Sequence, residues 1–392
     1  MHLEDWKEFR LRDFLIPALR PVVKPSDEFR AVGIRSHCGG TFERGNLDPE
    51  DISMETLYEV RAGDLIVNIT FAWEGAIAIV KKENEGGLVS HRFPTYVFNE
   101  RITNSNFFCH IFTQGRFRYL LKVISPGGAG RNRVLDKKDF LKLKVRLPEK
   151  PEQEKITAFL SALDEKIGQL SRKKELLTQY KKGVMQQIFD QKIRFKAVDG
   201  NDFPDWEEKR FGDVAKFSKG KGISKEDVSE NGQLECIRYG ELYTHYGETI
   251  SEVVSRTNLN ATTLVLSEPN DVIIPASGET NLDIATASCV LRKGIALGGD
   301  LNIIRSKLNG VFLAYYLNNK QKHNIARLAQ GVSVVHLYPS QLSTLKLAIP
   351  SEPEQKRIAV FLSAIDEKIK LVNAQLEKTK TFKKGLLQRM FV

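Results

Sequence analysis

The chain has 392 residues, and its 59 lysines and arginines against 49 aspartates and glutamates give a formal net charge of +10. A hydrophobic fraction of 41% excludes a disordered chain, and four scattered cysteines exclude a disulfide scaffold or a paired-cysteine zinc site. No apolar run reaches the roughly 18 residues of a membrane span, and no signal-peptide pattern is present. These features predict a soluble, cytoplasmic protein of two or three domains whose basic balance favours a polyanionic partner.

The first part of the chain, residues 1–147, is predicted to be a mixed α/β domain. Short β-like runs in it are bounded by turn residues, and an amphipathic stretch follows them. The predicted elements are strands at 64–67 and 76–80, a helix at 104–123, a glycine-containing loop at 127–133 and a closing strand at 141–147.

The next segment, 148–190, is predicted to form one long helix. Pro151 stands in the first turn, where its missing N–H costs no hydrogen bond, and Glu152 complements the helix dipole there. Apolar residues then recur in heptads, which is typical of a coiled coil. The seam positions that we expect to be apolar and packed are Ile156, Leu163, Leu170, Leu177 and Val184.

A linker at 191–204 leads to a second predicted mixed α/β domain at 205–349. Its elements are strands at 271–274 and 301–304, a helix at 311–329, a glycine-containing loop at 330–336 and a closing strand at 345–349. A second long helix, 350–392, ends the chain. Its expected seam positions are Ile358, Ile365, Val372, Leu376 and Leu386.

The two long helices are copies of one another. Without gaps, residues 148–189 align with 350–391 at 19 identities in 42 positions. A second, shorter similarity lies at the start of each domain, where Trp6 matches Trp206. Each helix has one apolar seam, so pairing the two seams within the chain is the simplest solution. The predicted fold class is therefore α/β (α+β): two globular mixed α/β domains separated by two long antiparallel coiled-coil helices with pseudo-two-fold symmetry.

Three positions on this expected seam are lysines, namely Lys174, Lys181 and Lys383. Their stems could lie on apolar surface while the ammonium groups reach water. Alternatively, the lysines could fix the register in which the two helices pair.

Motifs for catalysis are missing from the sequence. There is no phosphate-binding GxxxxGK[ST] loop, no dinucleotide GxGxxG after a strand, no GxSxG elbow and no HExxH zinc helix. The chain also lacks the NPP[FY] or DPP[FY] motif with which amino-methyltransferases hold a flipped base. We therefore expect no catalytic residue and no metal site in this chain.

The doubled helix motif resembles the specificity subunit of type I restriction–modification systems. The motif residues are Pro-x-x-Pro-Glu-Gln-x-x-Ile-x-x-Phe-Leu-Ser-x-[Leu/Ile]-Asp-Glu-Lys-Ile at 148–167 and 350–369, with Lys-Lys-Gly-x-x-Gln-x-x-Phe at 181–189 and 383–391. Such subunits are also similar to this chain in two shorter stretches, residues 32–37 and 71–75. The linker resembles them as well, around 193–195 and 203–206.

The resemblance implies a non-catalytic subunit of an adenine methyltransferase and endonuclease complex. In such a subunit each target-recognition domain binds one half of a bipartite double-stranded DNA site. The helices set the gap and dock two methyltransferase subunits, and restriction subunits join that core. S-adenosylmethionine, Mg and ATP are then expected on the partner subunits, and no cofactor is expected in this chain.

Candidate DNA contacts are arginine, lysine, histidine and other polar side chains in loops, where they could meet base edges. In the first domain they are Arg35, His37, Arg44, Arg131, Asn132 and Arg133. In the second they are Lys219, Lys221, Arg238, Tyr239, His245, Ser333 and His336. Each could instead be an ordinary surface residue, and 71–75 could be a packed corner or a base-stacking site.

The long helices carry further candidate contacts. Lys181-Lys182 and Lys383-Lys384 could bind phosphates or form a solvated helix face. Identical helix faces in the two copies suggest partner docking, at Asp164, Glu165, Lys166, Asp366, Glu367 and Lys368.

Two alternatives to a DNA-specificity subunit are a single-chain restriction or methyltransferase enzyme and a coiled-coil protein-binding adaptor without DNA specificity. The missing catalytic motifs argue against the enzyme. Net charge favours DNA over the adaptor only weakly, and the resemblance favours it strongly.

Overall fold

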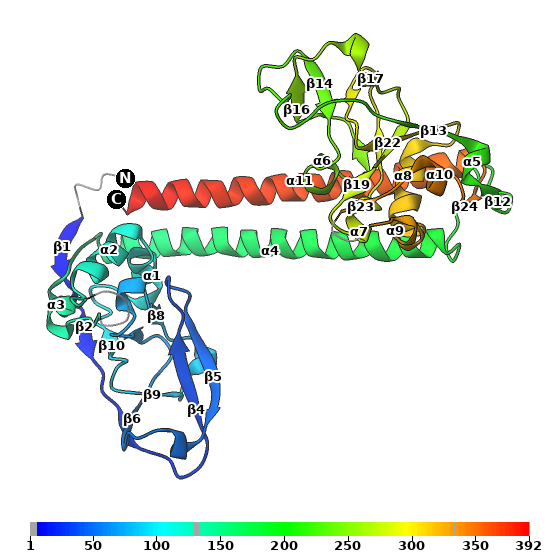
Figure 1. The fold of residues 1–392 in the computed structure, drawn as a ribbon. Coiled ribbons are helices and arrows are strands. Elements are labelled where there is room, and N and C mark those ends of the chain that lie inside the picture. The colour runs from blue at the N-terminus through cyan, green and yellow to red at the C-terminus, as the bar shows by residue number, and fades with distance from the viewer. Residues whose placement is uncertain (1–5, 129–132, 332–333, 392) are drawn as a thin grey trace. The chain divides into compact units, whose positions relative to one another are not determined.

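The computed structural model describes residues 6–128, 133–331 and 334–391. The chain forms two compact units, and each unit contains parts of both long helices. Unit 1 comprises Met1–Leu170 with Gln375–Val392, and unit 2 comprises Ser171–Ala374. The long helices are α4 (Lys150–Phe189) and α11 (Glu352–Met390), so each begins in one unit and ends in the other (Figure 1).

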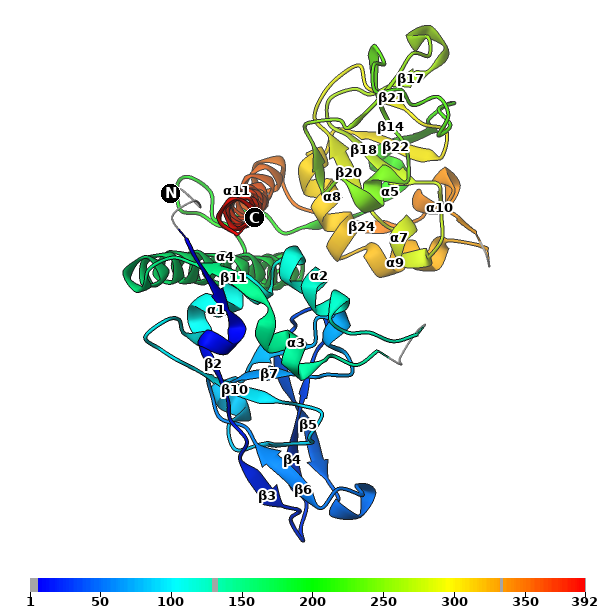
Figure 2. The same ribbon diagram turned by 90° about the vertical axis from the view of Figure 1, so that its left-hand side faces the viewer.

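The described residues of unit 1 form sheets of two, four and five strands, with the strand orders β1-β11, β2-β10-β7-β8 and β3-β6-β9-β4-β5. Helices α1 and α2 lie between the strands β4 and β6 and the start of α4 (Figures 1 and 2). The elements are β1 (Lys7–Arg10), β2 (Leu15–Pro17), β3 (Pro21–Val23), β4 (Phe29–Ile34), β5 (Thr41–Leu47), β6 (Thr56–Glu59), β7 (Leu65–Val67), β8 (Ile77–Ile79), β9 (Leu88–Val89), β10 (Thr95–Phe98), α1 (Ser105–Phe112), α2 (Gly115–Val123), α3 (Lys137–Lys142) and β11 (Lys144–Leu147).

The described residues of unit 2 likewise form one sheet of five strands, β13-β22-β18-β20-β15, and one of four, β16-β14-β21-β17. They also form two strand pairs, β12-β24 and β19-β23. The elements are β12 (Glu207–Arg210), α5 (Phe211–Val214), β13 (Ala215–Lys219), β14 (Leu234–Ile237), α6 (Glu241–Thr244), β15 (Thr249–Ile250), β16 (Ser255–Thr257), β17 (Val265–Leu266), β18 (Asp271–Pro275), β19 (Ser277–Gly278), α7 (Asn281–Ile284), β20 (Ser288–Val290), β21 (Ala296–Leu297), β22 (Leu301–Ser306), α8 (Gly310–Asn319), α9 (Lys322–Leu328), β23 (Val335–His336), α10 (Pro339–Leu342) and β24 (Lys346–Ile349).

Each unit is built on the same plan. The first strand pairs antiparallel with the strand that precedes the long helix, β1 with β11 in unit 1 and β12 with β24 in unit 2. The helices α1 and α8 also begin alike, because Asn104 and Asn309 accept hydrogen bonds from the N–H groups of Phe107 and Phe312. The structure therefore pairs α1 with α8 as equivalent elements of the duplicated plan.

Two single helices expected from the sequence are each broken in two. The stretch 104–123 forms α1 and α2, and 311–329 forms α8 and α9. At the first break the Thr113 hydroxyl donates to the carbonyl of Cys109 (2.9 Å), and the Gln114 amide donates to the carbonyl of His110 (2.7 Å). These bonds satisfy carbonyls at the end of α1, so local capping ends a helix that the apolar periodicity continues.

The closing strand of unit 1 is also shorter than expected. Leu141 and Lys142 belong to α3, and β11 begins at Lys144. The carboxylate of Asp136 accepts hydrogen bonds from the N–H groups of Lys138 and Asp139, which starts a helix that continues into the first two positions of the predicted strand.

The ends of the long helices belong to the cores of the units. In unit 1, Ile156 and Leu160 of α4 share a buried cluster with Met390 of α11. In unit 2, Ile358 and Leu362 of α11 share a cluster with Phe189 of α4. All ten expected seam residues are buried or half-buried, so the heptad pattern serves both helix pairing and domain packing.

The seam lysines end on polar groups of the opposite helix. Lys174 donates to the Asn373 amide oxygen at 2.6 Å, and Lys181 lies 2.7 Å from Asp366 in an ion pair within unit 2. In unit 1, Lys383 forms the equivalent ion pair with Asp164. Since only 15% of the Lys181 side chain is exposed, these contacts favour a role in fixing the register of the antiparallel pair.

The two ion pairs differ in the aromatic residue beside them. In unit 2 the hydroxyl of Tyr315 donates to Asp366. In unit 1 the equivalent residue on α1 is His110, and burial, together with the positive charge of Lys383, lowers the pKa of this imidazole to about 4. The ring therefore stays neutral beside Lys383 at neutral pH.

Because the folded pKa of His110 lies below the unfolded value of about 6.5, the unfolded chain binds more protons between these values. Unit 1 is thus expected to lose stability as the pH falls from about 6.5 to about 4. The loss should be on the order of 1–3 kcal/mol, since the ring is only half-buried.

The variant His110→Tyr should abolish this loss because tyrosine does not titrate in this pH range. Urea unfolding at a series of pH values measures it, with exposed His91→Tyr as the control; an unchanged pH slope in His110→Tyr would contradict the argument.

Candidate nucleic-acid interface

In unit 1 a tight loop after β4 carries Arg35 and His37, both exposed. His37 and Cys38 adopt left-handed backbone angles, with φ of 59° and 57°. The N–H groups of these two residues donate to the carbonyls of Glu74 (2.8 Å) and Gly75 (2.8 Å). The loop is therefore fastened to the neighbouring turn by its backbone, which leaves the side chains of Arg35 and His37 at the surface.

That neighbouring turn, residues 71–75, is a packed corner in this structure. Ala72 is buried, Gly75 closes the turn with a φ of 80°, and a Cβ added there would lie 3.4 Å from the His37 backbone. Trp73 is half-buried, and the guanidinium of Arg133 lies 5.6 Å from its ring centroid. The corner therefore brings Arg133 next to the loop that carries His37.

Arg35 and Arg44 lie on the hairpin of β4 and β5. The guanidinium of Arg35 stands 4.7 Å from the centroid of Phe42. Gly33 on β4 leaves room for the side chains of Phe42 and Arg44. A Cβ at this position would lie 2.7 Å from the Phe42 ring and 3.2 Å from Arg44 Cγ. Unit 1 thus gathers exposed cations and flat side chains at one end of β4 and β5, a composition that suits phosphate and base edges.

In unit 2 the short pair β19-β23 organises a second polar cluster, which we call the His336 cluster: Lys219, Ser277, Asp300, His336 and Tyr338. Ser277 and His336 are register partners in the strand pair. The ring of His336 stacks on Tyr338 with centroids 6.3 Å apart, and Lys219 Nζ lies 5.2 Å from the Tyr338 centroid. The exposed parts of this cluster are a cation and two stacked rings.

Hydrogen bonds set the protonation pattern of the cluster. The Ser277 hydroxyl lies 3.3 Å from Asp300 Oδ1, to which it donates, and 3.2 Å from His336 Nδ1. We assign the Nδ1 proton to His336, since the hydroxyl then accepts it, and this leaves Nε2 as an acceptor. The serine lies between the histidine and the aspartate, so the order differs from that of a hydrolase triad.

Two tyrosines, Tyr243 and Tyr239, pack beside the His336 cluster. Tyr243 donates to the carbonyl of Ser277 at 3.0 Å, and burial raises its pKa, so the donor stays protonated. Tyr239 packs edge-on against Tyr243 at 6.3 Å and is 38% exposed. Gly278 allows the approach, because a Cβ there would meet the Tyr243 hydroxyl at 3.0 Å.

The other residues predicted to contact DNA in unit 2 do not belong to the His336 cluster. Arg238 forms an ion pair with the buried carboxylate of Glu241 at 3.3 Å, so its guanidinium is committed to α6. Lys221 and His245 are exposed, and in the described part of the chain no hydrogen bond, ion pair or ring contact joins either to the His336 cluster. Arg131, Asn132 and Ser333 lie outside the described residues.

The helix faces predicted for docking are also divided. Asp164 and Asp366 are used in the ion pairs with Lys383 and Lys181. The remaining members are exposed on both helices; they are Glu165, Lys166, Glu367 and Lys368. Likewise Lys182 and Lys384 are exposed, whereas the lysines before them are paired.

Sequence reasoning missed Tyr338, Tyr243, Ser277 and Asp300 in unit 2, and Phe42 in unit 1. These residues stand in unremarkable sequence, and their positions relative to the predicted cations are decided by strand pairing. Only Tyr338 could have been added to the candidates from the sequence. It stands two residues after the candidate His336, just after the glycine-containing loop.

The comparisons with known proteins decide the family. The sequence profile of the type I restriction modification DNA specificity domain matches residues 3–179 and again residues 204–381. The chain belongs to this family. It is a DNA-specificity subunit of a type I restriction–modification system, a non-catalytic component of that enzyme.

Curated relatives and solved structures agree with this family. The chain is similar to the type I restriction enzyme MjaVIII specificity subunit of Methanocaldococcus jannaschii, at 23% identity over 98% of this chain and 91% of the relative. The putative MjaX specificity subunit of the same organism is 24% identical over 98% of this chain and 92% of the relative.

Among solved structures, the HsdS subunit from Thermoanaerobacter tengcongensis has a TM-score of 0.54 at 18% identity, covering 99% of this chain and 96% of that chain. The S subunit from M. genitalium has a TM-score of 0.60 at 14% identity, with coverages of 99% and 96%. The predicted fold class, two mixed α/β domains with two long helices packed together, is thus confirmed. Within the described ranges no helix combines the length and the apolarity that a membrane crossing requires.

Proposed function

We propose that this specificity subunit reads a bipartite double-stranded DNA site, one half through each domain. Residues 1–147 and 205–349 are then the target-recognition domains, 148–190 and 350–392 are the spacer helices, and 191–204 is the linker. The helices set the gap between the half-sites. They also dock two methyltransferase subunits, which restriction subunits join, and these partners supply S-adenosylmethionine, Mg and ATP.

The observation that carries the proposal is a shared scaffold with different exposed clusters. Both units repeat the first-to-last strand pair, the asparagine cap and the interhelical lysine–aspartate pair. Their surfaces differ: unit 1 exposes Arg35 and His37 near Trp73, whereas unit 2 exposes the His336 cluster. Two different readers on one repeated scaffold suit two unlike half-sites.

Docking of two partner copies is supported by the duplicated helix faces. Glu165-Lys166 and Glu367-Lys368 are identical pairs, exposed in both helices and absent from the interhelical ion pairs. A surface that occurs twice in one chain fits two copies of one partner.

The test is a map of methylated bases in a genome where this chain is expressed with the methyltransferase encoded beside its gene. We expect a split motif of two short specified parts around a fixed unspecified gap. Exchange of residues 1–147 for the equivalent domain of a relative should change only one part. A continuous motif, or an exchange that alters both parts, would overturn the proposal. No methylation by a folded complex would favour the protein-binding adaptor.

A further inference from the structure

A polar pocket of about 500 Å³ lies in unit 1, between the start of α2, the unit 1 part of α4 and the end of α11. Among the described side chains that line it, four are cations and one is a carboxylate. These are Arg118, Lys380, Lys383, Lys384 and Asp164. Two helices that are far apart in the sequence therefore bring their positive charges to one hollow.

The positive charge of this pocket is only partly compensated. Lys383 pairs with Asp164, and Lys380 forms an ion pair at 2.9 Å with a glutamate of its own helix. Arg118 and Lys384 are exposed, and within the described part of the chain their side chains make no hydrogen bond or ion pair. Two cations without a partner line the same space, which favours an anionic ligand there.

The equivalent lysine of unit 2 already contacts an additional anion. In the gapless alignment of the long helices Lys181 corresponds to Lys383, and it pairs with Asp366 as Lys383 pairs with Asp164. Lys181 also lies 2.9 Å from Oε2 of Glu248, which directly precedes β15. Among the described residues no second carboxylate contacts Lys383, and the pocket opens beside it. The repeated helices thus accept an oxyanion at this place, and unit 2 supplies one from its own chain.

Arg118 connects the pocket to the loop that carries His37. Helix α2 packs against the turn of residues 72–74. A Cβ added to Gly75 would lie 3.3 Å from Arg118 Cδ and 3.4 Å from the backbone of His37. Burial raises the pKa of the Cys38 thiol, and the nearby positive charge of Arg118 partly offsets this rise. The pocket therefore adjoins the loop whose exposed side chains are proposed to meet DNA.

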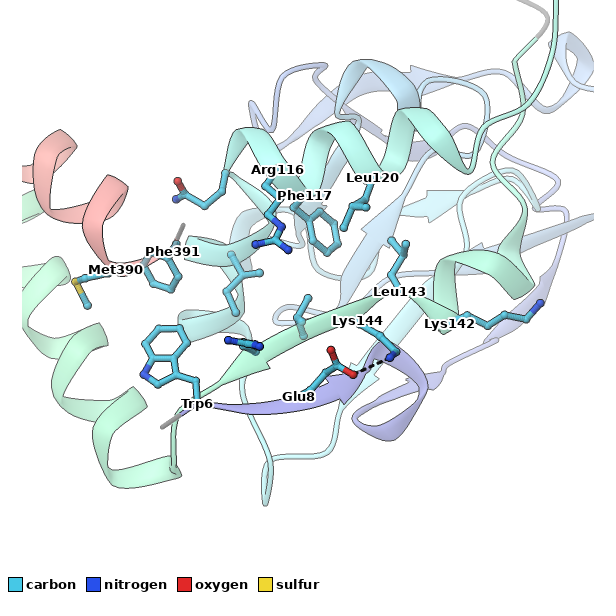
Figure 3. Close-up of a pocket in the computed structure, with 14 residues that line it drawn as sticks. Trp6, Glu8, Arg116, Phe117, Leu120, Lys142, Leu143, Lys144, Met390 and Phe391 are labelled. Carbon is cyan, nitrogen blue, oxygen red and sulfur yellow. Dashed lines mark ion pairs between the residues drawn. The ribbon is translucent and has the colours of Figure 1, made fainter. Parts of the chain in front are cut away.

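A second pocket of unit 1, of about 610 Å³, lies on the other side of Gln114, which lines both. Figure 3 shows aromatic side chains around it, Trp6 and Phe391 among them. At its rim Glu8 pairs with Lys144 at 2.7 Å. Walls of this kind suit a phosphate less than the pocket that contains Arg118, because an apolar surface offers an anion no hydrogen-bond donor.

We propose that the pocket formed by Arg118, Lys380, Lys383 and Lys384, called the Arg118 pocket, binds one backbone phosphate of the DNA that unit 1 reads. This contact rests on the proposed function and adds a binding site to it. The Arg118 guanidinium donates paired N–H groups to the phosphate oxygens, and the Lys384 ammonium supplies a second charge. Since a phosphate carries no base information, the pocket sets the position of unit 1 on the duplex and leaves the choice of sequence to the loops.

The test is a titration of the complex with methyltransferase against a duplex that carries its recognition site, with neutral methylphosphonates replacing single phosphates one position at a time. Arg118→Gln/Lys384→Gln should bind the unmodified duplex about tenfold more weakly, whatever the sequence of either half-site. Its plot of log affinity against log salt should be shallower by about 1. One methylphosphonate that weakens the wild-type complex about tenfold should have no further effect in this variant, because its contact is already lost.

Gly115→Glu tests the pocket without removing a cation. Gly115 is exposed and lines the pocket in the first turn of α2, and a Cβ there meets nothing within 4 Å. A glutamate suits the start of a helix and places a carboxylate in the pocket, as Glu248 does beside Lys181. The matched uncharged variant is Gly115→Gln. We expect Gly115→Glu to bind DNA about tenfold more weakly than Gly115→Gln.

The control for lost charge is Lys122→Gln/Lys378→Gln, which removes one exposed cation from each of the same two helices, outside the pocket. In this variant the sensitive methylphosphonate should keep its effect. The proposal would be overturned if Arg118→Gln/Lys384→Gln left every methylphosphonate effect unchanged. Loss of the methyltransferase from the variant complex would also overturn it, since the pocket would then hold an acidic segment of that partner. Both results leave a split methylation motif intact, whereas a wild-type complex that bound no DNA would overturn the proposed function as well.

Discussion

Replacement of Glu354 by alanine is expected to destabilise unit 2 by about 3 kcal/mol, a large part of the stability of a typical domain. The carboxylate is 1% exposed and is shared by the Arg194 guanidinium and the Trp206 indole N–H. The hydrogen bonds from Arg194 to Glu354 raise the pKa of this guanidinium. The arginine also stays charged in the variant, because a guanidinium is not deprotonated at ordinary pH even without a partner. The variant therefore leaves the indole N–H of half-buried Trp206 without its acceptor. It also removes the buried carboxylate from Arg194, whose guanidinium keeps the exposed Asp205 and the carbonyls of Phe203 and Pro204.

Hydrogen exchange measured by mass spectrometry is the suitable readout, since it follows each unit separately. Exchange should accelerate in α5, β24 and the start of α11, and the segments of unit 1 should be unaffected. The chain supplies its own matched control in Glu152→Ala, at the equivalent and half-buried position of unit 1. That variant should change stability by less than about 0.5 kcal/mol. Equal losses in the two variants would contradict the assigned role of the Arg194 contact.

The double variant His336→Ala/Tyr338→Ala is expected to lower the affinity of the complex for its DNA site about 100-fold. A stacked ring and a hydrogen-bonding imidazole each contribute about 1–3 kcal/mol in nucleic-acid recognition, and both would be lost. Because the cluster lies in unit 2, the specificity of only one half of the site should relax. The measurement is competition binding of the complex with methyltransferase against oligonucleotides mutated in either half, at one fixed salt concentration.

His323→Ala is the control for this variant, since His323 is an exposed histidine of the same unit on α9, outside the His336 cluster. It should leave affinity and specificity unchanged. If the double variant weakened binding equally for every oligonucleotide, the cluster would contact the phosphate backbone and would not read bases. If it had no effect on binding, the His336 cluster would not belong to the DNA interface.

Local patterns were sufficient to predict the two long helices. The segments 148–190 and 350–392 became α4 (Lys150–Phe189) and α11 (Glu352–Met390). Heptad periodicity and first-turn prolines act within a few residues, so they can be detected in a single sequence. The duplication and the doubled motif likewise identified the family without any structure.

Apolar periodicity did not predict where every helix ends. The apolar pattern of 104–123 continues through Thr113, but local hydrogen bonds from side chains to carbonyls four residues earlier end α1. Tertiary contacts pair Asp164 and Asp366, two of the residues predicted to dock a partner, with lysines more than 180 positions away. Chemically ordinary residues take a role here because a remote segment happens to oppose them.

By itself, the sequence determined the duplicated architecture, the α/β class, the long helices and the family. Only the tertiary structure decided which candidate contacts come together: it grouped Lys219 with His336 and Tyr338, separated Arg238 into an ion pair with Glu241, and exposed Phe159 while covering Phe361. Helices are specified by interactions three to seven residues apart, whereas a binding surface is assembled from loops by strand pairing across the whole domain. Such pairing leaves no local periodicity in the sequence, and for that reason the folded structure was needed to locate the sites.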